Sequence, residues 1–383
     1  MNEACDTMQI EPRIEELLER KLLRRDHPAY RVVDEAAVRS KLQALLTARG
    51  FGDASFISAI RLAGGASKEQ FLVEVDLGVG PERLVLRMDP DEGVVETCRF
   101  READVIAAMS GCVPVPAIRL LDGDGQWLGR PGLVTSFVSG VTKPPGQSKV
   151  VVSGVGTSFD RQWRDRLAPS FVENLGRMHA FDWRNADIGH YAAPRPGTIE
   201  AACWQVNWWS RVWRDDHLVD YPLIGVGERW LRDNLPVCDD PVMVHGDYRT
   251  GNFMFDAQTA EITAILDWEL AHIGDFHEDL GWTVQRLFAD VTKNGETLVC
   301  GLLTREDFLA RYEQATGRTV DRTILHFYEV LGAYKCATQL LASSLSAADR
   351  QHNHQDLLLA WLVPLGHTFL SDMARLILEG EGK

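Results

Sequence analysis

Residues 244–253 read Val244-His245-Gly246-Asp247-Tyr248-Arg249-Thr250-Gly251-Asn252-Phe253, a polar loop between two short apolar runs. A second polar loop ends the stretch Ala264-Ile265-Leu266-Asp267-Trp268-Glu269. The apolar runs predict short strands at about 242–244, 253–255 and 262–266. Either motif alone occurs by chance in ordinary loops. Their order, the spacing of the Asp and the Asn and the flanking strands together indicate a functional site.

These residue types suit the transfer of a phosphoryl group to a hydroxyl. The Asp247 carboxylate can position a weakly acidic hydroxyl and accept its proton. Asn252 and Asp267 can supply oxygen ligands to Mg²⁺, which needs few protein groups when phosphates and waters complete its shell. We therefore predict Asp247 as a catalytic residue and Asn252 and Asp267 as metal ligands, in the order of a kinase catalytic loop and its metal aspartate.

The pattern H-G-D-x-x-x-x-N followed by D-x-E resembles the aminoglycoside phosphotransferase and choline kinase superfamily. The resemblance covers the chain from about residue 35. It looks closest to the branch related to the kinase-like domains fused to acyl-CoA dehydrogenases, on the stretches 84–90, 113–116 and 273–275. It implies an α+β, two-lobed protein-kinase-like fold, with a small antiparallel-sheet N-lobe and a larger, mainly helical C-lobe.

The resemblance also assigns residues to the nucleotide phosphates. Gly64, Gly65 and Ser67 match the turn that covers the phosphates, where glycines allow close backbone approach. The family often has Asn after this serine, where Lys68 stands here. Arg87 occupies the position of the usual ATP-holding lysine. An arginine can still span two phosphates, although its fork is not equivalent to an ammonium.

Further roles are implied around these positions. Glu102 is expected to be the ion-pair partner of Arg87. Ser136 and Val138 lie in the segment that resembles the interlobe hinge, whose backbone would meet the adenine edge. Arg249 is a catalytic candidate that would neutralise the transferring phosphoryl group, or else a surface arginine. Glu269 is expected to support the metal site without binding the metal directly.

Three groups of residues are expected to be structural. His245 should orient the catalytic loop by hydrogen bonds, and His179 should pack behind it. Asp279 should brace the same loops, as should Asp275. Metal binding by the polar turn 352–354, which carries two histidines, is disfavoured.

Spacing and turn residues outline the organisation of the chain. We expect a helical extension at 1–34, a nucleotide-covering N-lobe at 35–138, a flexible connection at 139–160 and a helical C-lobe with the acceptor site at 161–383. Strands are predicted at 56–62, 70–75, 83–88, 118–121, 126–128 and 133–137, with a hairpin turn at 78–81. Helices are predicted at about 35–49, 94–109, 165–182, 200–217, 225–234, 277–288, 304–316, 322–342 and 355–378, and an amphipathic helix within 1–26.

Composition narrows the class of protein. The 383 residues carry a net charge of -15, which repels phosphate backbones and disfavours nucleic acid as a partner. The seven scattered cysteines indicate a reducing compartment and no zinc site. The N-terminus lacks a signal peptide, and the apolar run 357–370 is judged too short to span a bilayer. A cytoplasmic protein without a membrane partner is expected, and its oligomeric state stays open.

The stretch 203–213 contains four tryptophans at helical spacing. Trp204 and Trp208 share one ridge, and Trp209 and Trp213 share the next. Either both ridges are core, or one faces the cleft and offers a flat apolar wall to the acceptor.

The function expected from these observations is ATP-dependent (or GTP-dependent) and Mg²⁺-dependent phosphorylation of a small-molecule hydroxyl. The acceptor stays open between an aminoglycoside-type antibiotic, an amino alcohol, a sugar and a hydroxylated acyl compound. The alternative is a nucleotide-binding regulatory module with little catalysis. The intact set of Asp247, Asn252 and Asp267 argues against that alternative.

Overall fold

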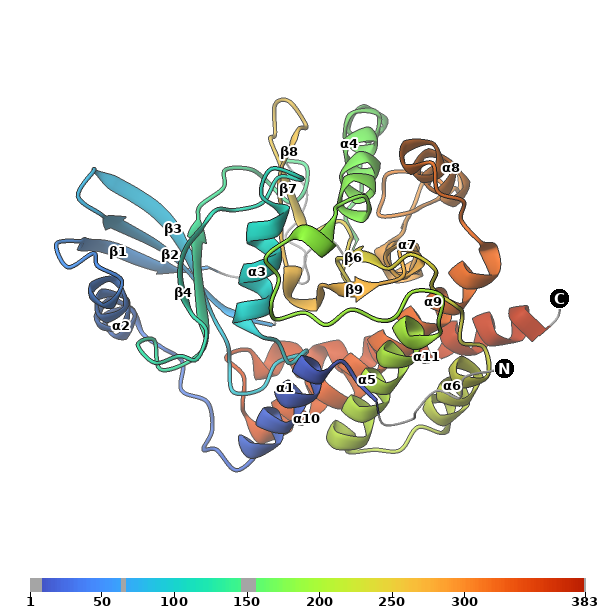
Figure 1. Cartoon of the computed structure of the whole chain (residues 1–383), viewed down its shortest axis with the longest axis horizontal. Coiled ribbons are helices and arrows are strands. Elements are labelled where there is room, and N and C mark those ends of the chain that lie inside the picture. Colours follow the sequence, from blue (N-terminus) through green and yellow to red (C-terminus); the bar gives the residue numbers. More distant parts are fainter. Residues whose placement is uncertain (1–8, 63–66, 146–155, 382–383) are drawn as a thin grey trace.

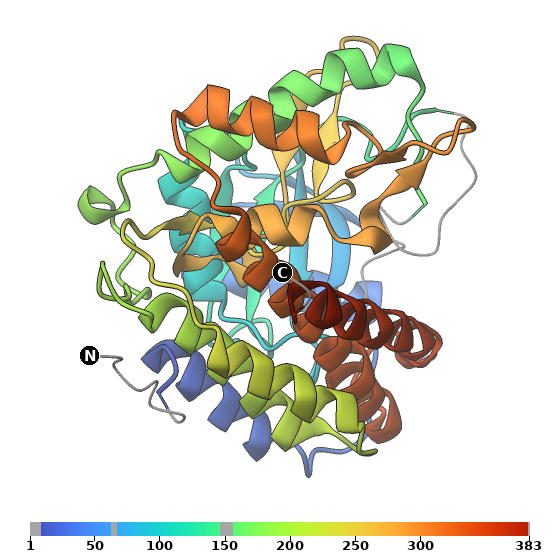
Figure 2. The same ribbon diagram turned by 90° about the vertical axis from the view of Figure 1, so that its right-hand side faces the viewer.

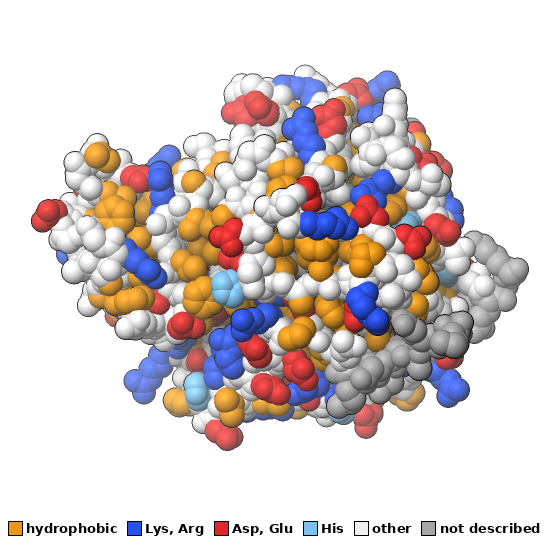
Figure 3. Space-filling model, viewed as in Figure 1, with side chains coloured by type: hydrophobic (Ala, Val, Ile, Leu, Met, Phe, Trp, Pro, Cys, Tyr) orange, Lys and Arg blue, Asp and Glu red, His pale blue; other side chains and the backbone are white. Residues whose placement is uncertain are grey.

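The computed structural model describes residues 9–62, 67–145 and 156–381. They form two lobes, a small one built on a five-stranded antiparallel sheet and a larger, mainly helical one (Figure 1). The α+β arrangement expected from the sequence is confirmed. Acidic and basic side chains are interspersed over the face seen in Figure 3, with apolar side chains gathered in patches between them.

The small lobe follows the predicted order of elements. Its strands are β1 (Ser55–Arg61), β2 (Glu69–Asp76), β3 (Pro81–Met88), β4 (Ile118–Asp122) and β5 (Gly132–Ser136), in the spatial order β1-β2-β3-β5-β4. Helix α2 (Glu35–Ala48) packs on the sheet, and α3 (Arg99–Met109) follows β3 and lies between the sheet and the large lobe (Figure 1).

Strand alternation sets which side chains of β3 face the large lobe. Leu84, Leu86 and Met88 are buried in the core that the sheet shares with α2. Successive side chains of a strand point to opposite faces. Val85 and Arg87 therefore face the cleft between the lobes, where both line a cavity.

Two predictions in this lobe are wrong. The helix predicted at 94–109 begins only at Arg99. Residues 126–128 form no strand, because their three backbone amides donate to the carboxylate of Asp122 over 2.7–2.9 Å and fold into a turn. The predicted hairpin between β2 and β3 is confirmed by the pairing of Asp76 with Pro81.

The large lobe holds most of the helices. They are α4 (Arg161–His179), α5 (Glu200–Asp216), α6 (Pro222–Asp233), α7 (His277–Thr283), α8 (Arg305–Thr316), α9 (Arg322–Thr338), α10 (Leu345–Arg350) and α11 (Asp356–Glu381), with the π-helical segment η4 (Gln339–Ser344) after α9. Short 3-10 turns are η1 (Trp183–Asn185), η2 (Trp268–Leu270) and η3 (Arg286–Phe288). Helix α7 ends earlier than predicted, and η3 covers the remainder.

Short strands frame the polar loops of the large lobe. They are β6 (Val242–Val244), β7 (Phe253–Phe255), β8 (Ile262–Ile265) and β9 (His272–Gly274), with β10 (Asp290–Val291) and β11 (Thr297–Leu298) further along the chain. Strand β6 pairs with β9, and β7 pairs with β8. The three strands predicted here are confirmed, whereas β9 was not predicted.

The amphipathic helix expected near the N-terminus is α1 (Pro12–Leu23), which buries Ile14, Leu17 and Leu18. Two buried ion pairs hold α1 and the residue before it against the rest of the protein. Glu11 pairs with Arg101 of α3, and Lys21 pairs with Asp216 of α5.

Two expectations from composition need correction. Helix α11 spans 26 residues and continues well beyond 370, so by length and composition it is long and apolar enough to cross a membrane. It packs against α9 and η4, and Figure 2 shows it in dark red beside them. Cys203 is disulfide-bonded, so the expectation that every cysteine is reduced is wrong for this residue.

Candidate active site

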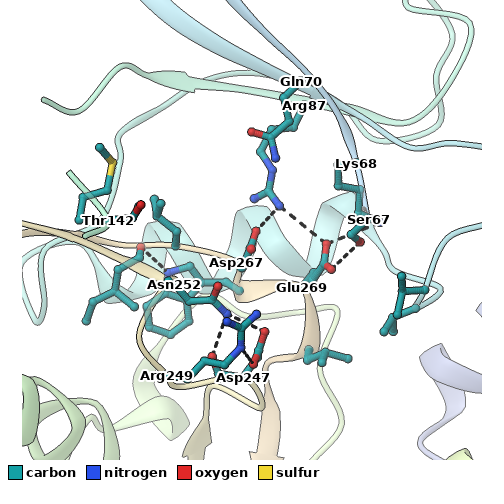
Figure 4. A pocket seen from close by; sticks show the side chains of 18 of the residues that line it. Ser67, Lys68, Gln70, Arg87, Thr142, Asp247, Arg249, Asn252, Asp267 and Glu269 are labelled. Carbon is teal, nitrogen blue, oxygen red and sulfur yellow. Dashed lines mark hydrogen bonds and ion pairs between the residues drawn. The ribbon is translucent and has the colours of Figure 1, made fainter. Parts of the chain in front are cut away.

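A cavity of about 550 Å³ lies between the two lobes. Its upper wall comes from the small lobe and includes Arg87 and Lys68, while the loops after β6 and β8 contribute Asp247 and Asp267. Figure 4 shows these side chains converging on one space, with Arg87 reaching from the sheet toward Asp267 and Glu269.

The turn after β6 delivers Asp247 to the cavity. Gly246 adopts φ +79°, and a Cβ there would lie 2.6 Å from the carbonyl oxygen of Leu270, so the turn requires glycine. One carboxylate oxygen of Asp247 accepts from Arg249 Nε at 2.8 Å and from Trp282 Nε1 at 2.6 Å. The other accepts from Asn252 Nδ2 at 2.6 Å. Three donors thus fix the orientation of this carboxylate.

The backbone of this loop rests on a buried aspartate, as predicted. Asp279 accepts from the amides of His245 and Gly246 at 2.8 Å each and contacts His179 Nε2 at 3.1 Å. Burial alone would raise the pKa of Asp279, but these partners lower it overall. From the other side, Lys335 Nζ donates to the carbonyl of Gly246 at 2.8 Å.

His245 joins the two polar loops, which confirms the structural role predicted for it. Burial lowers the pKa of His245, which favours the neutral ring. Its Nδ1 can then accept from the amide of Asp247 at 3.2 Å while Nε2 donates to the carbonyl of Leu266 at 3.0 Å. The carbonyl of Asn252 accepts from the amide of Leu266 at 2.7 Å, so each predicted metal ligand is held close to the other.

Arg87 and Glu102 form the predicted ion pair, at 2.6 Å. Arg87 also pairs with Asp267, and Glu102 is shared with Arg99. Burial alone would lower the pKa of Arg87, but Glu102 and Asp267 raise it overall. Asp267 sits at φ +60° with its side chain 40% exposed, so its carboxylate is accessible from the cavity.

Lys68 stands where the family often has asparagine, and its side chain belongs to the same charged network. Its Nζ donates to Thr97 Oγ1 at 2.6 Å and lies 3.4 Å from Asp89 and 3.6 Å from Glu269. Ser67 donates to Glu269 at 2.7 Å, which links the residues just before β2 to the second polar loop. Gly64 and Gly65 lie outside the described residues.

The structure also places the remaining predicted residues. Ser136 and Val138 line the cavity where β5 leaves the sheet. Arg249 is mostly buried and paired with Asp247, which rules out a surface arginine. His352 contacts Glu92 at 2.8 Å. No group of three or more His, Cys, Asp or Glu residues in the described part of the chain could hold a metal ion by itself.

The tryptophans of α5 are core residues. Trp204, Trp208, Trp209 and Trp213 are all buried, and the cavity is lined by other described residues. The apolar lining of the cavity comes instead from Trp282 and from the helices after residue 335, among other described residues. Apart from their apolar character, these residues carry no sequence signal for this position, because spacing alone does not show which late helix packs against a cavity.

The fold and the site together define a kinase-type phosphotransferase, with basic groups on one wall of an interlobe cavity and a fixed aspartate on the other. The chain belongs to the phosphotransferase enzyme family, whose model matches residues 58–326.

Individual proteins are similar to the chain in sequence or in fold. The chain is 29% identical over 213 residues to acyl-CoA dehydrogenase family member 11 of Gallus gallus, covering 49% of this chain and 27% of that protein. It thus spans about a quarter of the length of that relative.

Two solved structures share its fold. The first is a Ralstonia eutropha protein with a proposed aminoglycoside phosphotransferase assignment (TM-score 0.62, 22% identity, 88% of this chain and 98% of that one). The second is a thermostable mutant of aminoglycoside phosphotransferase APH(4)-Ia in ternary complex with AMP-PNP and hygromycin B (TM-score 0.55, 14% identity, 87% and 98%).

Proposed function

We propose that the chain is a small-molecule kinase that transfers the γ-phosphoryl group of ATP or GTP, with Mg²⁺, to a hydroxyl of an acceptor with an aliphatic part. The position of Asp247 carries the proposal, because its carboxylate lies in a cavity that both basic and apolar side chains line. A carboxylate there can align a hydroxyl with the γ-phosphorus and take its proton.

The three donors around Asp247 determine how it would act. Arg249 and Trp282 hold one oxygen and Asn252 holds the other, so the carboxylate keeps one orientation as the acceptor arrives. The acceptor oxygen attacks the γ-phosphorus, the bond to the β–γ bridging oxygen breaks, and the nucleoside diphosphate leaves. The hydroxyl proton passes to Asp247.

The oxygen groups in the second loop fit a magnesium ion. Asp267 presents an accessible carboxylate, and Asn252 is held beside it. Glu269 Oε2 is buried and has no hydrogen-bond partner among the described residues. Mg²⁺ binds through one or two carboxylates plus phosphates, so a site without a protein cage suits it. When bound, the ion would screen the phosphate charge.

The small lobe offers partners for the nucleotide. Arg87 and Lys68 face the place where the phosphates would lie, and both are now paired with carboxylates. The fold neighbour with AMP-PNP supports a nucleotide in this cleft. Ser136 and Val138 would then lie beside the base.

The acceptor end of the cavity is apolar. It is lined by Phe288, Leu340, Leu358, Leu362, Leu365 and Phe369. A polycationic antibiotic would need carboxylates here, whereas an aliphatic chain gains free energy from burial against leucine and phenylalanine. The lining therefore favours an acceptor with a hydrocarbon part over the more polar candidates.

The test is a direct search for the acceptor. The protein is incubated with ATP or GTP and Mg²⁺ against aliphatic hydroxy compounds, amino alcohols, sugars and an aminoglycoside, and phosphate esters are detected by ³¹P NMR. We expect ester formation with the aliphatic hydroxy compounds and none with the Asp247→Asn variant. Nucleotide binding that raises the melting temperature without ester formation on any acceptor would instead support a regulatory module.

A further inference from the structure

One buried polar group that lines the cavity lacks a hydrogen-bond partner in the part of the chain that the structure describes. Gln339 begins η4, lines the cavity and is 8% exposed. Its Nε2 has no hydrogen-bond partner among the described residues. Buried amide donors are nearly always paired, because leaving one unpaired is costly. Because Gln339 lines the cavity, a ligand there that meets its amide could supply the missing partner.

The backbone around Gln339 is also unusual. Helix α9 widens at this residue into a π-helical turn, and such turns often occur at functional sites. Gln339 lines the same cavity as Asp247, and so does Cys336, one turn earlier on α9.

The surroundings restrict the chemistry of the missing partner. The other side chains that α9, η4 and α11 contribute to the described cavity are leucines, a phenylalanine and one cysteine. The basic side chains of the cavity, Lys68, Arg87 and Arg249, are already paired with carboxylates. A carboxylate beside Gln339 would lose its hydration without gaining a counter-charge, so a neutral oxygen fits better.

We propose that Gln339 determines acceptor specificity by donating a hydrogen bond from its amide to a neutral carbonyl oxygen of the acceptor. The acceptor class is then an aliphatic compound that carries both a hydroxyl and an ester, thioester, amide or ketone carbonyl. The inference rests on the proposed function, because the hydroxyl must reach Asp247 while the carbonyl meets Gln339.

The test compares three acceptors of equal chain length, namely a hydroxy ester, the corresponding hydroxy acid and an alcohol without a carbonyl. We expect the wild type to favour the ester. Gln339→Leu, which keeps a similar volume, should lower kcat/KM for the ester about 10-fold and leave the plain alcohol unchanged. Gln339→Glu should be worse for the ester, because it sets a carboxylate oxygen against the carbonyl.

Two further readouts separate recognition from structure. Gln70→Leu is the matched control, because Gln70 is an amide on the opposite, β2 wall of the same cavity, and it should not change the ester-to-alcohol ratio. Gln339→Leu should keep or raise the melting temperature, because it removes an unpaired buried donor. An unchanged ester-to-alcohol ratio in Gln339→Leu, with the wild type active, overturns this inference alone. A wild type inactive on all three acceptors overturns it together with the proposed function.

Discussion

The indole Nε1 of Trp282 donates a hydrogen bond to Oδ1 of Asp247 over 2.6 Å. Trp282 lies on α7, and Lys335 Nζ sits 4.5 Å from the centre of one of its rings. Because Lys335 also donates to the carbonyl of Gly246, the same lysine supports both the proposed catalytic loop and the residue that orients its carboxylate.

Replacing Trp282 by Phe tests the importance of this hydrogen bond. The variant keeps an aromatic ring under Lys335 but removes the donor to Asp247. We expect kcat to fall about 10- to 100-fold while the affinity for nucleotide stays the same, because one charged hydrogen bond contributes about 1.5–3 kcal/mol. Steady-state kinetics and nucleotide titration check this. A fall in melting temperature with unchanged kcat would show that Trp282 only packs.

The Asp247→Asn variant tests the catalytic carboxylate. We expect turnover to fall by about 10²–10⁴-fold, because the amide cannot accept the hydroxyl proton. Nucleotide affinity should stay close to that of the wild type, since Asp247 faces the acceptor. Calorimetric titration with a non-hydrolysable nucleotide measures affinity separately from turnover. Near-wild-type turnover would show that another group positions the acceptor.

The metal ligands are tested by Asp267→Ala and Asn252→Ala. Asp267→Ala should weaken Mg²⁺-dependent nucleotide binding and turnover together. Asn252→Ala should weaken Mg²⁺ binding less, since an amide carries no charge, although it also frees one oxygen of Asp247. Nucleotide titrations over a range of Mg²⁺ concentrations give both effects. Retention of Mg²⁺ dependence in both variants would place the ligands elsewhere.

The arginine on β3 is tested by a matched pair of variants. Arg87→Lys should retain measurable activity, because an ammonium can still pair with a phosphate. Arg87→Met should raise KM for the nucleotide and lower kcat, and it leaves Glu102 with Arg99 as its remaining ion-pair partner in the described network. Initial rates at varied nucleotide concentration give KM and kcat for both variants. If neither substitution alters KM, Lys68 becomes the better candidate for holding the phosphates.

The support beneath the catalytic loop has a predictable pH dependence. The pKa of Asp279 is lowered from 3.8 in the folded protein, so its contribution to stability is complete above about pH 4 and is lost as the pH falls through the folded value. Asp279→Asn should cost about 2–4 kcal/mol near neutral pH, because one of two backbone amides would face an NH₂ group. Melting curves from pH 7 to pH 3 should show the difference from the wild type shrinking toward acid pH. A difference that is constant over this range would contradict the assignment.

The sequence predicted those parts of the site that lie in one loop or on one strand. Asp247 and Asn252 are five positions apart between short strands, a local relationship that residue spacing is enough to find. Arg87 is identified through the family resemblance of its strand, and the alternation of side chains along β3 directs it into the cavity.

The remaining parts depend on packing between distant segments. Gln339 and the leucines of α11 reach the cavity only because late helices fold back beside the loop at 245–252. The tryptophans of α5 carry the stronger apolar pattern, but they are used in the core. Hydrophobic spacing identifies a buried face without showing which neighbour it meets. The turn at 126–128 was not predicted for a related reason. The carboxylate of Asp122 accepts hydrogen bonds from those backbone amides, so they do not pair with a neighbouring strand.

Helix α1 and the residue before it have a thermodynamic consequence. Glu11 is paired with Arg101 in the small lobe and Lys21 with Asp216 in the large one. Both pairs are buried, so separating the lobes would expose at least one charged partner without its counter-ion. Unfolding one lobe alone would then cost additional free energy. We therefore expect the two lobes to unfold as one cooperative unit, although a cavity lies between them.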